Sequence, residues 1–159
     1  MDATLAIASL VRENALKGAE ISSAIFKLLS STPPHAAPRE VYDVAKAVSE
    51  LSGNVGRITR VWPAPKFHSL YTTKETLGRQ ATITLERISL LYDEIQALID
   101  SGNAAARLLW AFRRTRWRLL LLQADAYSTG VRIITNTMVL AEQLRNAHGY
   151  VSSNLPKCH

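Results

Sequence analysis

The amino-acid sequence predicts an all-α fold, an up-and-down bundle of four long helices that internal breaks could raise to five or six. Apolar residues recur at steps of three and four in every segment between turn signals. Segments that contain proline or glycine divide the 159 residues into four such lengths. No stretch alternates apolar and polar residues for long enough to form a strand. The length suits a single domain, 1–159, in which about 149–159 form a flexible tail.

The first helix is expected over 3–31. It ends at TPPHAAP, residues 32–38, because proline lacks the backbone N–H that a helix needs and disfavours helix in the residue before it. Small residues recur at helical spacing along one face of this helix and would let a neighbouring helix approach closely. They are Ala8, Ala15, Gly18 and Ser22.

The second and third helices each carry one apolar seam. The second is expected over 39–60, before the break VWPAPKFHS, and its seam is Val41, Val44, Val48, Leu51, Val55, Ile58 and Trp62. The third is expected over about 72–100, with a seam of Leu77, Ala81, Ile88, Leu91, Ile95 and Leu98 that Leu85, Tyr92 and Ile99 widen. SGN at 101–103 then supplies a C-cap glycine and an N-cap asparagine.

The last helical pattern, 104–148, has two adjacent apolar seams, which predicts packing against more than one neighbour. One seam is Leu108, Phe112, Leu119, Leu122, Ala126, Ile133 and Leu140; the other is Leu120, Ala124, Tyr127, Val131, Ile134, Met138 and Ala141. At ~1.5 Å per residue an unbroken helix would span about 68 Å, whereas a compact domain of this size has a radius of gyration of about 15 Å. We therefore expect a break near Ser128, Thr129 and Gly130, or a helix that projects from the bundle. The expected core includes Val48, Leu51, Leu91, Ile95, Phe112, Leu119 and Leu122.

The positive charge is concentrated in the last third of the chain. The net charge is +6, yet residues 1–103 carry eleven basic and eleven acidic side chains, and residues 104–159 carry eight basic against two acidic ones. The single cysteine, Cys158, excludes a disulfide framework and suits a reducing compartment. No apolar stretch reaches the ~18–20 residues of a transmembrane helix, and the N-terminus lacks the basic region of a signal peptide. A cytoplasmic location is therefore expected.

Signatures of catalysis are missing from the sequence. It contains no G-x-G-x-x-G, G-x-x-x-x-G-K-[ST], H-E-x-x-H or G-x-S-x-G. The four histidines fall in expected loops or at the end of the last helix, far apart and without a cysteine pair. We expect no enzymatic activity, no cofactor and no metal site.

A basic and aromatic stretch opens the last helical pattern. It contains Arg107, Trp110, Arg113, Arg114, Arg116, Trp117 and Arg118. At 100° per residue, Leu108, Phe112, Thr115, Leu119 and Leu122 form one strip, which is expected to face the core. Trp110, Trp117 and Leu121 then fall on the opposite, outer side, beside guanidinium groups.

Three interpretations of this stretch compete. The tryptophans can pack under a loop while the arginines stack on them or pair with acids such as Asp93 and Glu94. The same face can bind anionic lipid headgroups or an acidic partner. Nucleic acid is the least favoured ligand, because no recognised binding motif surrounds the stretch and lysine is sparse there.

The N-terminus suggests a membrane-insertion segment. In MDATLAIASLV only Asp2 is charged, and Leu5, Ile7, Leu10 and Val11 supply the apolar bulk. The alternative is a core helix with a tight interface, as the small-residue face would also favour. On the membrane interpretation, the helix packs in the resting bundle and is released into a bilayer.

Two motifs in the chain resemble the helical N-terminal domains of fungal STAND/NOD-like receptors and related proteins. One is the start, with Met1, Asp2, Leu5, Ile7, Ala8 and Leu10. The other is the stretch from Trp110 through Phe112 to Arg113 and Arg114, which looks like the W-x-[FL]-[KR]-[KR] element near the start of their last long helix, and the leucines 119–122 follow it.

That resemblance implies a HeLo-like bundle, similar in architecture to the four-helix domain of mixed-lineage kinase domain-like protein. It implies roles in programmed cell death, heterokaryon incompatibility and innate immunity. It also implies self-association on a signal from a receptor domain, C-terminal or upstream, followed by recruitment to anionic lipids of the plasma membrane and attack by the N-terminal helix.

Two function classes follow from these observations. The first is a non-enzymatic HeLo-like effector that targets membranes and induces cell death when it oligomerises. The second is a protein–protein adaptor bundle, whose basic–aromatic face docks an acidic partner and which has no membrane activity.

Overall fold

The fold is all-α in the part of the chain that the computed structural model describes, residues 3–31, 39–61, 71–100 and 110–153. It consists of α1 (Ala3–Ser30), α2 (Arg39–Val61), α3 (Tyr71–Asp100) and α4 (Trp110–Ser153), and these ranges contain no strand. The predicted four-helix bundle is confirmed. The bounds of α1, α2 and α3 agree with the sequence prediction to within one residue, because proline and glycine segments separate them.

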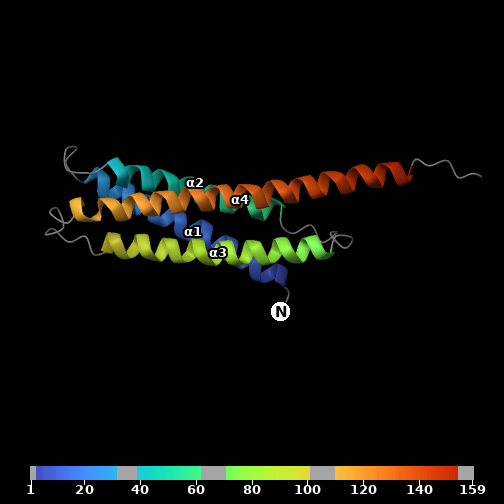
Figure 1. Ribbon diagram of the computed structural model, residues 1–159, viewed down its shortest axis with the longest axis horizontal. Coiled ribbons are helices and arrows are strands. Elements are labelled where there is room, and N and C mark those ends of the chain that lie inside the picture. The colour runs from blue at the N-terminus through green and yellow to red at the C-terminus, as the bar shows by residue number, and fades with distance from the viewer. Residues whose placement is uncertain (1–2, 32–38, 62–70, 101–109, 154–159) are drawn as a thin grey trace, which may run out of the picture.

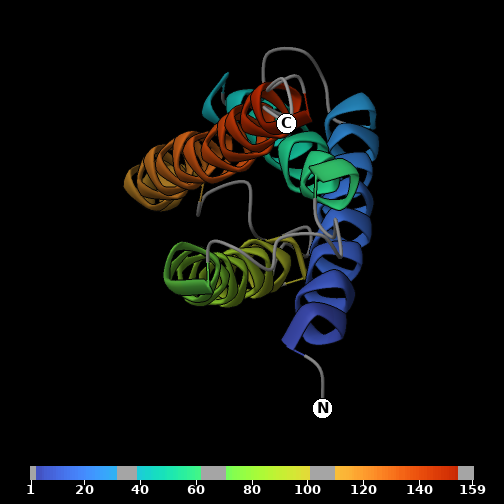
Figure 2. The ribbon, with the colours of Figure 1, turned by 90° about the vertical axis from the view of Figure 1, so that its right-hand side faces the viewer.

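Consecutive helices run in opposite directions, with α3 and α4 along the long axis of the molecule and α1 inclined to it (Figure 1 and Figure 2). Each helix packs against two others: α1 and α4 both contact α2 and α3. Viewed along the axis, α1 and α4 therefore lie at opposite corners, with α2 and α3 between them (Figure 2). This arrangement places the N-terminal helix on the far side of the bundle from the arginine-rich start of α4.

The core is built from the predicted seams of α2 and α3. The seam of α2 from Val41 to Ile58 is fully buried, including the predicted core residues Val48 and Leu51. On α3, Leu91 and Ile95 are buried as predicted, together with Ala81, Leu85, Ile88 and Tyr92. Trp62, the last position predicted for the α2 seam, lies outside the described residues.

The small-residue face of α1 is the contact surface between α1 and α2. Ser52 Oγ on α2 donates to the carbonyl oxygen of Ala15 at 2.7 Å, and Ser22 Oγ on α1 donates to that of Ala45 at 3.0 Å. Gly18 lies against Tyr92 of α3, and a Cβ there would be only 2.5 Å from Tyr92 Oη. In the bundle this small-residue face therefore forms a tight contact between core helices, which is the alternative to the membrane interpretation of α1.

Helix α4 is continuous through residues 128–130, so the break expected there is absent and the projecting helix is observed instead. Two hydrogen bonds hold this region in the helix: Thr129 Oγ1 donates to the carbonyl oxygen of Asp125 at 3.0 Å, and Asn54 Nδ2 of α2 donates to Ser128 Oγ at 2.7 Å. The C-terminal end of α4 extends past the other helices (Figure 1). It reaches Ser153, beyond the predicted end at 148, so 149–153 are helical rather than part of a flexible tail. Residues 104–109 and 154–159 lie outside the described part.

The prediction of which face of α4 enters the core is wrong. Leu119 is 46% exposed and Leu122 is 65% exposed, whereas Trp117, Leu120 and Ala124 are buried. The buried seam continues through Val131, Ile134 and Met138. This seam repeats at steps of three and four without a polar interruption from Trp117 to Met138, whereas Thr115, Thr129 and Asn136 interrupt the other. An unbroken apolar stripe makes the better core contact. Phe112, the remaining core prediction, has a side chain outside the described part.

Candidate functional site

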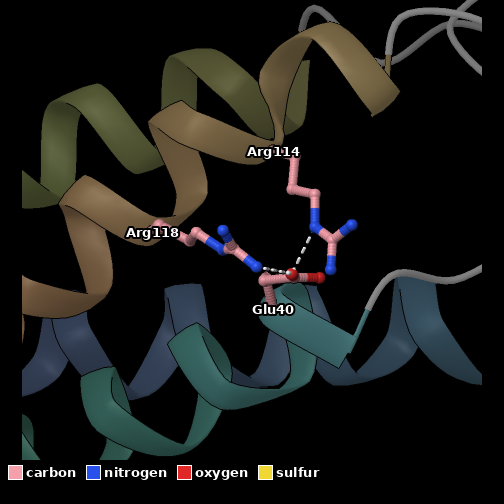
Figure 3. A network of polar contacts seen from close by, with 3 residues as sticks. All are labelled: Glu40, Arg114 and Arg118. Atoms are coloured by element: carbon pink, nitrogen blue, oxygen red, sulfur yellow. Dashed lines mark hydrogen bonds and ion pairs between the residues drawn. The ribbon is translucent and has the colours of Figure 1, made fainter.

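Two arginines of α4 converge on one carboxylate of α2. Arg114 Nε lies 2.5 Å from Glu40 Oε1, and Arg118 Nη2 lies 3.3 Å from the same oxygen (Figure 3). The two arginines are four residues apart and so lie on one face of α4, one turn from each other. The Glu40 side chain is only 12% exposed. These contacts join the start of α4 to the start of α2.

The surroundings of Glu40 keep its carboxylate charged. The pKa of Glu40 is lowered first by a hydrogen bond from its own backbone amide and then by the hydrogen bond from Arg114. Partial burial acts in the opposite direction, and the positive charges of Arg114 and Arg118 lower the pKa further. The carboxylate therefore remains ionised over a wider range of acidic pH than an ordinary glutamate.

A third arginine bonds to α3. Arg116 Nη2 forms an ion pair with Glu94 Oε1, one of the pairings that the sequence suggested. Asp93, the other suggested acid, instead accepts from Lys17 Nζ of α1 at 2.6 Å. The side chains of Arg114, Arg116 and Arg118 nevertheless stay 53–58% exposed. Because Arg114 and Arg118 share one carboxylate, the three arginines and their two acidic partners keep net positive charge.

The predicted outer face of tryptophans and arginines does not include Trp117. Its side chain is 3% exposed and belongs to the main core cluster, and Leu121 is half-buried against that cluster. Trp117 lies inside because it continues the buried seam of α4 one step toward the N-terminus. Arg107 and the side chains of Trp110 and Arg113 lie outside the described part of the chain.

The predicted membrane-insertion residues lie inside the bundle where the structure describes them. Ile7 and Val11 are 3% and 1% exposed, and Leu10 is half-buried against the same core. The side chain of Leu5 lies outside the described part. Within the residues that the structure describes, no helix is long and apolar enough to cross a membrane.

The sequence did not reveal an exposed apolar stripe along α4. We call Leu119, Leu122, Ala126, Ile133 and Leu140 the outer stripe. Its large members are 46–65% exposed, and it lies on the side of α4 that faces away from the buried seam. Among the described residues, six of the eleven exposed large hydrophobic side chains lie on α4, so this helix is the main apolar surface. The polar residues that interrupt this seam were the signal that could have marked it as exposed.

The contacts that the described residues show at these surfaces are ion pairs and apolar packing. The described residues contain no group of three or more His, Cys, Asp or Glu side chains that could hold a metal ion. The titratable groups of the arginine cluster are engaged in ion pairs between helices. The two features that a partner could recognise are the outer stripe and the positive start of α4.

Comparison of the chain with protein-family models, curated proteins and solved structures gave no match. The HeLo-like resemblance therefore remains a prediction from two short motifs, and any function must be argued from the residues of the bundle.

Proposed function

We propose that the chain is a non-enzymatic interaction bundle that pairs the outer stripe of α4 with an amphipathic helix of a protein partner. The observation that carries this proposal is the exposure of Leu119, Leu122, Ile133 and Leu140 on one side of a single helix. Large contiguous apolar patches on a protein surface commonly mark contacts with other proteins. Apolar residues at steps of three, four and seven are the pattern by which one helix docks on another.

Two threonine hydroxyls beside the outer stripe do not oppose its burial. The hydroxyl of Thr129 donates to the carbonyl oxygen of Asp125 at 3.0 Å, and that of Thr137 donates to the carbonyl oxygen of Ile133 at 2.9 Å. Because both donors are satisfied within α4, a partner helix can cover them without leaving a buried polar group unpaired.

This docking surface differs from the basic–aromatic face that the sequence suggested for an adaptor. Trp117 is in the core, and Arg114 and Arg116 bind acids of α2 and α3. The arginines stabilise the position of α4 and belong to no part of the outer stripe, whose side chains remain available to a partner.

Photo-crosslinking in cells that produce the protein tests the docking function. A benzophenone side chain at position 122 or 133 should form protein adducts, because both positions lie in the outer stripe. The control positions are 46 on α2 and 90 on α3, which are also exposed. Adduct formation at 122 and 133 no greater than at the two controls would contradict the proposal.

A second candidate is the membrane-targeting HeLo-like effector. The position of α1 favours this candidate. Helix α1 packs on α2 and α3, and α4 has its own contacts with α2 and α3, which would remain if α1 left the bundle. Release of α1 would expose Ile7 and Val11, which now lie in the core. Leu, Ile and Val each gain only about 0.3–0.6 kcal/mol at the centre of a membrane helix, so several copies would have to act together.

Liposome leakage tests the effector candidate. Deletion of residues 2–11, or Leu10→Glu, should eliminate leakage, whereas binding to anionic vesicles through the arginines should largely survive. Each surface-apposed arginine should contribute about 1 kcal/mol, so binding should weaken with salt. Most of the binding to anionic vesicles should be lost when glutamine replaces Arg113, Arg114, Arg116 and Arg118. Leakage that persists after the deletion, or no leakage by the intact chain at any concentration, would reject this candidate.

A further inference from the structure

We infer that the helix which pairs with the outer stripe is α4 of a second copy of this chain, running antiparallel to the first. This inference rests on the docking function proposed above and adds the identity and orientation of the partner. A two-fold symmetric contact uses the same surface on both copies, so each favourable pairing occurs twice.

Side-chain size favours a register centred between Ala126 and Thr129. In that register Leu122 faces Ile133 of the second copy, and Ala126 faces Thr129 of the second copy. In these two central layers large side chains meet large ones and small ones meet small ones, with both pairings repeated by symmetry, and in the next layer outward Leu119 faces Asn136 of the second copy. Apolar residues at alternating steps of three and four form the layers of such a helix pair.

Charge also favours the antiparallel orientation. Asp125 and Arg132 are exposed and seven residues apart, so they lie on the same edge of the outer stripe. In the register described, Asp125 lies beside Arg132 of the second copy, and Arg132 beside Asp125 of the second copy. A parallel pair would place Gly130 beside Asp125 and Thr137 beside Arg132, and both opposite-charge pairs would be lost.

The arginine-rich start of α4 gives a second electrostatic reason. Arg114 and Arg118 are half-exposed and share a single carboxylate. A parallel pair would bring two such positive ends together, and like charges repel across an interface. The antiparallel pair separates them by about 35 Å along the helix axis, several times the ~8 Å screening length at physiological salt.

The size of the contact predicts a reversible dimer. A single helix pair lies at the low end of specific interfaces, below about 1,200 Å² of total buried surface. The dimer should therefore form at micromolar or higher concentration and dissociate on dilution.

Sedimentation of the purified chain tests whether the partner is a second copy. The wild-type chain should change from monomer to dimer as concentration rises. Leu122→Glu should remain monomeric with an unchanged helical signal, because this side chain is 65% exposed in the bundle. The matched control is Leu90→Glu on α3, where the leucine is 68% exposed and lies off the outer stripe, and it should dimerise like wild type.

Disulfide trapping tests the orientation. In a Cys158→Ser background, Ala126→Cys and Thr129→Cys are made separately, with tags of different mass. Mild oxidation of the mixture should give several-fold more hetero-crosslink than either variant gives with itself. Crosslinking of Ala126→Cys mainly to itself would indicate a parallel pair and overturn the orientation. A chain that stays monomeric at every concentration would overturn the second copy as the partner. Adducts to other proteins at positions 122 and 133 would then still support the docking function. The absence of such adducts would contradict both the docking function and the second copy as partner.

Discussion

Gly18 lies where α1 comes close to both α2 and α3. A Cβ at this position would lie 2.5 Å from Tyr92 Oη and 2.9 Å from Ser52 Cβ, and Tyr92 is fully buried, so its ring has little room to move. We expect Gly18→Ala to destabilise the bundle by about 1–3 kcal/mol in urea unfolding, as overpacked cores do. Gly53→Ala on α2 is the control, because its Cβ would meet nothing within 4 Å. It should stabilise the chain by about 0.5–1 kcal/mol, since alanine is the better helix former. A stabilising Gly18→Ala would contradict the close contact.

Glu40 makes the attachment of α4 sensitive to acid. The pKa of Glu40 is lowered in the folded state, so its charge stabilises the bundle fully at any pH above the ordinary glutamate pKa of about 4.3. That stabilisation is lost as the pH falls through the lowered pKa of the folded state. Glu40→Gln should lower the thermal midpoint at neutral pH, and the difference from wild type should shrink as the pH falls below about 4. Glu50→Gln is the control, because Glu50 is exposed and its ion-pair distance to Lys46 is 3.9 Å. A difference that stays constant down to low pH would contradict the role of the Glu40 charge.

At the scale of the element, α4 has one apolar face for the fold and another for a partner. Leu120 is 1% exposed and Leu122 is 65% exposed, although the two leucines are only two positions apart in the sequence. Leu120→Ala should cost about 2–5 kcal/mol of unfolding free energy, whereas Leu122→Ala should cost less than about 0.5 kcal/mol in dilute solution. Comparable losses at both positions in urea unfolding would mean that the two faces are misassigned.

The extent of sequence-based prediction differs between the helices. The single seams of α2 and α3 predicted the buried residues, because only one face of each helix could enter a core. The two seams of α4 look alike by composition, and apolar residues also occur on protein surfaces. The choice between them depends on the neighbours that α4 meets. Trp117 was placed outside for the same reason, and Glu40 was not foreseen as the shared acid because its position beside α4 arises only when the helices pack.

At the scale of the whole molecule, α4 combines internal support with an accessible surface. Its start is held to α2 and α3 by ion pairs, and its middle is held to α2 by the bond from Asn54 to Ser128. None of the side chains that make these contacts belongs to the outer stripe, so a partner can cover the stripe without displacing them. The bundle thus presents the outer stripe on a supported helix, which limits the conformational entropy lost on binding.

The most direct test of this account compares two adjacent isoleucines of α4 by methyl NMR. Ile133 is 61% exposed on the outer stripe, and Ile134 is 7% exposed in the core. As protein concentration rises from micromolar to millimolar, the Ile133 methyl signal should shift or broaden while the Ile134 signal stays in place. An unchanged Ile133 signal across the whole range, or equal changes at both residues, would contradict self-association through the outer face of α4.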